Sequence, residues 1–131
     1  MERKEKLTGI FGSTVIILVI ALLAMNINLN QPVVQTKSCS NYPILAPGNL
    51  IVVQNTDFEN IEEGETVVYR VLSENLTVTH QVVSKSEKSL QTKGENNRKQ
   101  LPFESSVNSS QIWGTSAFVI PIDSGSKCSS R

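Results

Sequence analysis

Two residues could together carry out covalent chemistry: Ser40, and the chain's single histidine, His80. A serine hydroxyl is a weak nucleophile unless a nearby base takes its proton, and a neutral imidazole is well suited to this near pH 7. Ser40 stands in a short polar segment that ends at Pro43. Taken alone, a histidine on an apolar strand face is more often a hydrogen-bonded core residue. The pair nevertheless suggests a serine nucleophile with a histidine base.

The elements that must position this pair have the pattern of strands. Beyond residue 30, short runs rich in Val, Ile and Thr alternate with turn residues, which is typical of a small sheet domain. The third of these runs carries His80, and strand alternation puts it on the same side as Val78 and Val82. The fold class we predict is mostly β, with a polar loop over 93–109 and a frayed tail from Asp123. We expect strands at 49–54, 65–72, 76–84 and 88–92, and one or two more within 111–122.

The N-terminal part is apolar and uncharged over a long stretch. About 20 such residues are enough to cross a bilayer core of about 30 Å. We therefore expect a cytosolic N-terminus at 1–6, one transmembrane helix at 7–29 and an extracytoplasmic domain at 30–131. The basic residues within 1–6 favour this orientation. The alternative is a signal peptide cleaved after Ala24, which would put Leu22 where a small residue is preferred.

Composition narrows the possible ligands. Lys plus Arg and Asp plus Glu both number 12, and aromatic residues make up 5% of the chain. Without a basic surface or stacking platforms, nucleic-acid binding is disfavoured. One histidine and two distant cysteines do not have zinc-ligand spacing, so we expect no metal or other cofactor. Cys39 and Cys128 either pair in an oxidising compartment or remain free thiols, and the sequence leaves both open.

Several segments, in order, resemble the type I signal peptidases. The resemblance covers roughly 34–125 and is to the serine-histidine branch, which includes the endoplasmic-reticulum catalytic subunit, archaeal enzymes and some Gram-positive ones. The resembling segments are Ser38-Cys39-Ser40-Asn41-Tyr42-Pro43 with the turn and strand at 47–53, Gly64-Glu65-Thr66-Val67-Val68-Tyr69-Arg70, Thr79-His80-Gln81-Val82, Thr92-Lys93-Gly94-Glu95-Asn96-Asn97 and 120–125.

The resemblance implies a small signal-peptidase-like β domain of a membrane-bound serine endopeptidase that removes signal peptides from secreted preproteins. Ser40 would be the nucleophile and His80 the general base, with the Ser40 amide and the Ser38 hydroxyl as oxyanion donors. Asn41 and Tyr42 replace the family's Met and Glu and would shape the substrate pocket. The implied partners are preprotein signal peptides, membrane lipid and secretion machinery. The implied location is the cell membrane, or the endoplasmic-reticulum membrane in a eukaryote.

The acid that supports the histidine departs from the family pattern. Glu95 is the candidate, because the later family aspartate falls near Gln100 or Leu101, and neither can hold a negative charge. Loss of the orienting charge of a triad can cost about 10⁴ in turnover. The alternative function is therefore a weakened or inactive membrane-anchored β domain that binds secreted or surface polypeptides.

Two alternative chemistries use other residues near the same segments. A Cys39 thiolate could attack in place of Ser40. Lys85 or Lys93 could act as the base, as in a serine-lysine dyad, although neither occupies the family's base position.

Overall fold

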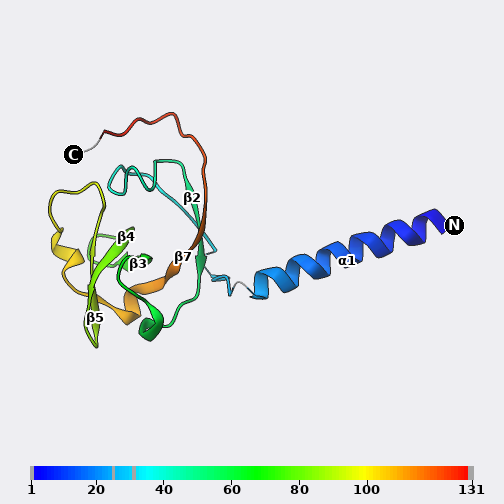
Figure 1. Cartoon of the computed structure of the whole chain (residues 1–131), viewed down its shortest axis with the longest axis horizontal. Helices are drawn as coiled ribbons and strands as arrows, with labels where there is room; N and C mark the ends of the chain where they lie inside the picture. The colour runs from blue at the N-terminus through cyan, green and yellow to red at the C-terminus, as the bar shows by residue number, and fades with distance from the viewer. Residues whose placement is uncertain (1, 25, 31, 130–131) are drawn as a thin grey trace.

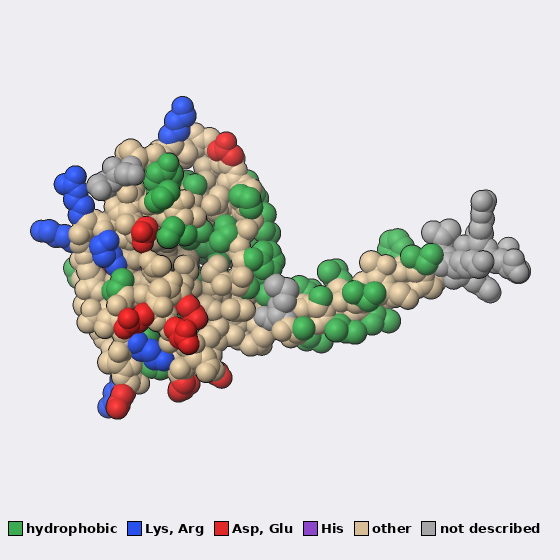
Figure 2. All heavy atoms as spheres, viewed as in Figure 1, with side chains coloured by type: hydrophobic (Ala, Val, Ile, Leu, Met, Phe, Trp, Pro, Cys, Tyr) green, Lys and Arg blue, Asp and Glu red, His purple; other side chains and the backbone are tan. Residues whose placement is uncertain are grey.

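Helix α1 (Glu2–Ala24) extends away from a β domain formed further along the chain (Figure 1). The computed structural model describes residues 2–24, 26–30 and 32–129. Apolar side chains of the helix are solvent-exposed from Ile10 onward, and others gather on the side of the domain from which the helix leaves (Figure 2). In the described part of the chain, no helix combines the length and apolarity needed to cross a membrane. The anchor expected at 7–29 stays a prediction.

The domain is built on one antiparallel sheet, which confirms the mostly β expectation. Within the described residues its strand order is β1-β2-β7-β3-β4-β5-β6. In the part of the chain that the structure describes, three short 3₁₀ helices lie between the strands: η1 (Phe58–Asn60), η2 (Pro102–Glu104) and η3 (Ser109–Gln111). The strands are β1 (Val33–Gln35), β2 (Leu50–Gln54), β3 (Thr66–Val71), β4 (Leu76–Lys85), β5 (Ser89–Lys93), β6 (Val107–Asn108) and β7 (Ile112–Ile120).

The four expected central strands correspond to β2, β3, β4 and β5, and the region 111–122 forms the single strand β7. The sequence did not predict β1 and β6. Both are so short that they offer no alternating pattern, and β6 lies within the expected loop over 93–109. That loop also contains η2, and this helix contributes to the site described below.

The core forms in two apolar clusters. The smaller one consists of Leu45, Ile51, Val53 and Val68. In β4, Val78, His80 and Val82 are all buried, as alternation predicted, whereas Leu76 at the strand's start is 43% exposed. The histidine therefore lies in a strand whose neighbouring side chains are fixed by packing. The larger cluster consists of Ile61, Val67, Tyr69, Val71, Val78, Val82, Leu90 and Val107.

Candidate active site

The structure brings Ser40 and His80 into direct contact. Ser40 lies in the segment 38–43, which we call the nucleophile segment, and its Oγ is 2.9 Å from His80 Nε2. His80 is 5% exposed in β4, whereas Ser40 is half-buried. A hydroxyl at this distance from an imidazole nitrogen can give up its proton to that nitrogen as it attacks an electrophile.

Glu104 occupies the other side of the imidazole, and sequence reasoning missed it. Its Oε1 contacts His80 Nδ1, and the side chain is fully buried. Its second oxygen, Oε2, accepts the Leu101 N–H at 2.6 Å. A carboxylate held in this way selects the tautomer with a proton on Nδ1 and a free lone pair on Nε2. One signal was present: Pro102 followed by Glu104 is a helix-start pattern within a segment expected to be a loop.

Glu95, the acid expected from the sequence, is exposed in the turn after β5. Its backbone N–H donates to Asn41 Oδ1 at 3.3 Å. The chain turns at residues 94–97 as soon as β5 ends at Lys93, whereas η2 comes back against β5 further along. The carboxylate that contacts the histidine therefore belongs to Glu104 and not to Glu95.

Burial dominates the electrostatics of His80. Desolvation lowers the pKa of its imidazole below the ordinary 6.5, because the charged form loses its hydration. The charge and hydrogen bond of Glu104 oppose this by raising the pKa, and Lys93 lowers it further. With a lowered pKa, His80 is neutral near pH 7 and can accept a proton.

Ser38 lies beside the nucleophile. Its Oγ is 2.9 Å from Ser40 Oγ and accepts a hydrogen bond from the Ser40 N–H at 3.4 Å. The Ser38 hydroxyl and the Ser40 amide are therefore on the same side of the segment, where both could donate to one oxygen. An oxyanion site requires two donors that converge on one oxygen, and these two groups remain the candidates for that role.

Asn41 and Tyr42, the two residues expected to shape the substrate pocket, contact the protein's own backbone. Asn41 is 5% exposed, and its Nδ2 donates to the Thr79 carbonyl in β4. Tyr42 is half-buried, and its N–H donates to the Cys39 carbonyl at 3.1 Å. Asn41 also lines the groove described below, and it ties the nucleophile segment to the strand that carries His80.

Gly94 allows the turn after β5 to approach the site. A Cβ atom at this position would lie 2.7 Å from the Ser40 carbonyl oxygen and 3.1 Å from His80 Nε2. The first distance is shorter than real Cβ contacts allow. A side chain at Gly94 would therefore push the turn away from the serine-histidine pair.

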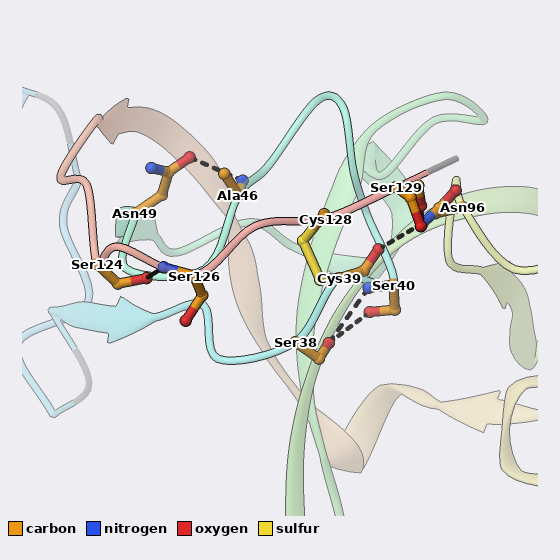
Figure 3. The surroundings of a disulfide bond; sticks show 10 residues. All are labelled: Ser38, Cys39, Ser40, Ala46, Asn49, Asn96, Ser124, Ser126, Cys128 and Ser129. Atoms are coloured by element: carbon orange, nitrogen blue, oxygen red, sulfur yellow. Dashed lines mark hydrogen bonds between the residues drawn. A yellow bond between two sulfur atoms is a disulfide. The ribbon is translucent and has the colours of Figure 1, made fainter. Parts of the chain in front are cut away.

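The two cysteines form a disulfide, Cys39–Cys128, which answers the question that the sequence left open. Figure 3 shows the C-terminal tail crossing beside the nucleophile segment at this bond. Because its sulfur is bonded, Cys39 is not a free thiolate, and this contradicts the alternative in which it attacks.

The two lysines considered as bases donate to backbone carbonyls and not to Ser40. The Lys85 Nζ donates to the carbonyls of Phe58, Glu59 and Ile61 around η1. The Lys93 Nζ donates to the Gly94 carbonyl at 3.1 Å. The basic atom in contact with Ser40 Oγ is His80 Nε2.

A groove of about 870 Å³ opens onto these residues. Ser38, Ser40 and His80 line it together with Val33–Thr36, so one wall contains the edge strand β1. The remaining lining is mixed, with apolar side chains such as Val34 and Phe103 beside polar ones such as Arg70 and Asn97. An extended peptide can pair with an edge strand and direct alternate side chains into such a groove.

The sequence of this chain is similar to that of a known protein. The chain is 39% identical over 73 residues to the signal peptidase complex catalytic subunit SEC11 of Colletotrichum graminicola. This supports a type I signal-peptidase-like relationship. The match covers 52% of the present chain and 42% of SEC11, so the chain spans well under half of that relative's length. No family model matches the chain.

Proposed function

We propose that this chain is a serine endopeptidase that removes signal peptides from preproteins. The observation that carries the proposal is the chain of contacts from Ser40 Oγ through the His80 imidazole to the buried Glu104 carboxylate. The similarity to a SEC11 catalytic subunit supports the same activity and suggests that the chain acts at a secretory membrane with complex partners.

In the proposed reaction, Ser40 Oγ attacks the carbonyl carbon of the scissile peptide bond. The hydroxyl proton passes to His80 Nε2, and the carbonyl π electrons move to the oxygen, where the Ser40 N–H and the Ser38 hydroxyl donate to it. When this intermediate collapses, the C–N bond breaks and His80 gives the proton to the leaving amine. A water molecule then hydrolyses the acyl-serine by the same route.

Glu104 acts through His80 in this mechanism. Its carboxylate accepts a hydrogen bond from Nδ1–H, keeps the lone pair on Nε2 and stabilises the imidazolium that forms during attack. This role needs a negative charge beside the ring, and a carboxylate at the buried position of Glu104 would act on the imidazolium with little screening by water. The alternative of an inactive domain rested on the lack of an acid beside the histidine. In this proposal, Glu104 is that acid.

The test is processing of a model preprotein in membranes that contain the full chain. We expect cleavage after a small residue, established by sequencing the new N-terminus, and loss of cleavage in Ser40→Ala and His80→Ala. Ser73→Ala, which alters an exposed serine in the turn between β3 and β4, is the matched control and should process normally.

Equal inertness of the wild-type chain and both variants toward several well-inserted preproteins would refute the proposal. A non-catalytic β domain that binds secreted or surface polypeptides would then be the better description. A fluorophosphonate probe gives a second readout, because it labels a serine only when the base beside it is competent.

A further inference from the structure

Asn96 is a buried polar residue that holds the backbone on both sides of Ser40. It is 7% exposed and lies in the turn after β5. Its backbone N–H donates to the Ser40 carbonyl oxygen at 2.8 Å. Its side-chain Nδ2 donates to the Cys39 carbonyl oxygen at 3.1 Å. The carbonyl of Cys39 and the carbonyl of Ser40 are therefore both held by Asn96.

The Cys39 carbonyl and the Ser40 N–H belong to the same peptide unit. In a planar trans peptide the C=O and N–H bonds point in opposite directions. A group that holds the Cys39 carbonyl therefore also fixes the direction of the Ser40 N–H, which points toward the Ser38 hydroxyl. In the proposed reaction, that N–H is one of the two donors to the oxyanion.

The Asn96 amide is itself held by the C-terminal tail. Its Nδ2 also donates to the Ser129 carbonyl at 3.0 Å, and Ser129 follows the disulfide-bonded Cys128 (Figure 3). An amide nitrogen carries two hydrogens, so each carbonyl can receive one. The tail, the turn after β5 and the nucleophile segment thus meet at one side chain.

We propose that Asn96 is a positioning residue that orients the Cys39–Ser40 peptide unit, so that the Ser40 N–H is held on the side of the Ser38 hydroxyl where the oxyanion would form, with the disulfide-anchored tail holding the Asn96 amide. This inference rests on the proposed function and deepens it. The Tyr42 N–H also donates to the Cys39 carbonyl, so removal of the Asn96 side chain loosens the peptide unit without freeing it.

The experiment compares Asn96→Ala with wild type in the full chain, using a peptide substrate and a peptide aldehyde inhibitor. The aldehyde adds to Ser40 Oγ: a C–O bond forms, the proton moves to His80 and the carbonyl electrons move to the oxygen, which imitates the oxyanion. We expect kcat to fall about tenfold, less than the ~10²–10³ that loss of a whole oxyanion donor costs. Aldehyde affinity should fall by the same factor while KM stays unchanged.

Arg98→Ala changes an exposed residue of the same loop and should behave as wild type. An unchanged kcat in folded Asn96→Ala, a change in KM alone, or an equal loss in Arg98→Ala would overturn the inference. If Asn96→Ala does not fold, Asn96→Asp keeps the size of the side chain but cannot donate to either carbonyl when ionised. It should show the same division between kcat and KM.

Failure of the inference about Asn96 can be distinguished from failure of the proposed function. If the wild-type chain proves no more active than Ser40→Ala, the proposed function fails, and the ¹⁵N–¹H signal of the Ser40 amide decides the orienting role. A shift of that signal in Asn96→Ala, absent in Arg98→Ala, would support it. An unmoved signal would overturn it.

Discussion

At the scale of single residues, Glu104 is the acid on which activity should depend. Its Oε1 contacts His80 Nδ1 inside the protein, where a neutral amide cannot replace the negative charge. We expect Glu104→Gln to lower kcat by about 10³- to 10⁴-fold, as loss of the orienting charge does in a triad, with little change in KM. Steady-state kinetics of the purified full chain measure this.

Glu95→Gln is the matched comparison for that prediction, because it makes the same chemical change at the exposed carboxylate predicted from the sequence. A larger loss of kcat in Glu95→Gln than in Glu104→Gln would return the supporting role to Glu95. Thermal unfolding of both variants separates a catalytic effect from loss of the fold.

The pKa of His80 should set the lowest pH at which the reaction proceeds at full rate. Burial lowers the pKa of its imidazole below 6.5, so the base stays neutral to lower pH than a free histidine. We expect kcat/KM to be constant near pH 7. The midpoint of its fall at acid pH should lie below 6.5, and below that midpoint kcat/KM should fall tenfold per pH unit. Because Glu104 raises this pKa, Glu104→Gln should move the residual activity's midpoint lower still.

The lowered pKa of His80 also predicts how the free energy of unfolding depends on pH. Since the folded pKa lies below the unfolded one, the contribution of His80 to stability is fully present above pH 6.5 and is lost as the pH falls below it. A pH-rate midpoint above 6.5 would contradict both statements, and a midpoint that rises in Glu104→Gln would contradict the claim that Glu104 raises this pKa.

Prediction from the sequence succeeded for those residues whose position follows from local pattern. His80 was placed on the buried face of its strand by alternation, and its meeting with Ser40 was expected from residue chemistry and family resemblance. Glu104 was not predicted because it lies 24 positions from His80 in the sequence, and the packing of η2 against β5 brings the two side chains together. The spacing of the two residues in the sequence does not indicate that contact.

At the scale of elements, the long strands were predictable and the short ones were not. β3 and β4 each contain enough alternating or β-branched residues to show a period of two, and their register puts Val67 opposite His80. In contrast, β1 has three residues and β6 has two, and both depend on the neighbouring strand for their extended form. The unpredicted β1 nevertheless forms part of the groove wall.

At the scale of the whole molecule, the disulfide joins the tail to the nucleophile segment across 89 positions of sequence. Pairing depends on tertiary proximity, which is why the sequence left it open. Closing a loop of this length restricts the unfolded chain, an effect that typically stabilises a protein by about 2–4 kcal/mol. We expect the double variant Cys39→Ser/Cys128→Ser to lose about that much free energy of unfolding in urea titrations.

Dithiothreitol provides the control for this prediction, because it should destabilise the wild-type chain by a similar amount and leave the double variant unchanged. The released tail would also withdraw the Ser129 carbonyl from the Asn96 amide, so catalysis and stability should decline together. An unaltered urea midpoint in the double variant would show that the tail's other contacts suffice, among them its packing against Gly48. The disulfide would then have no part in stabilising the fold, and any remaining loss of turnover would be traced to the nucleophile segment and the Asn96 amide that holds it.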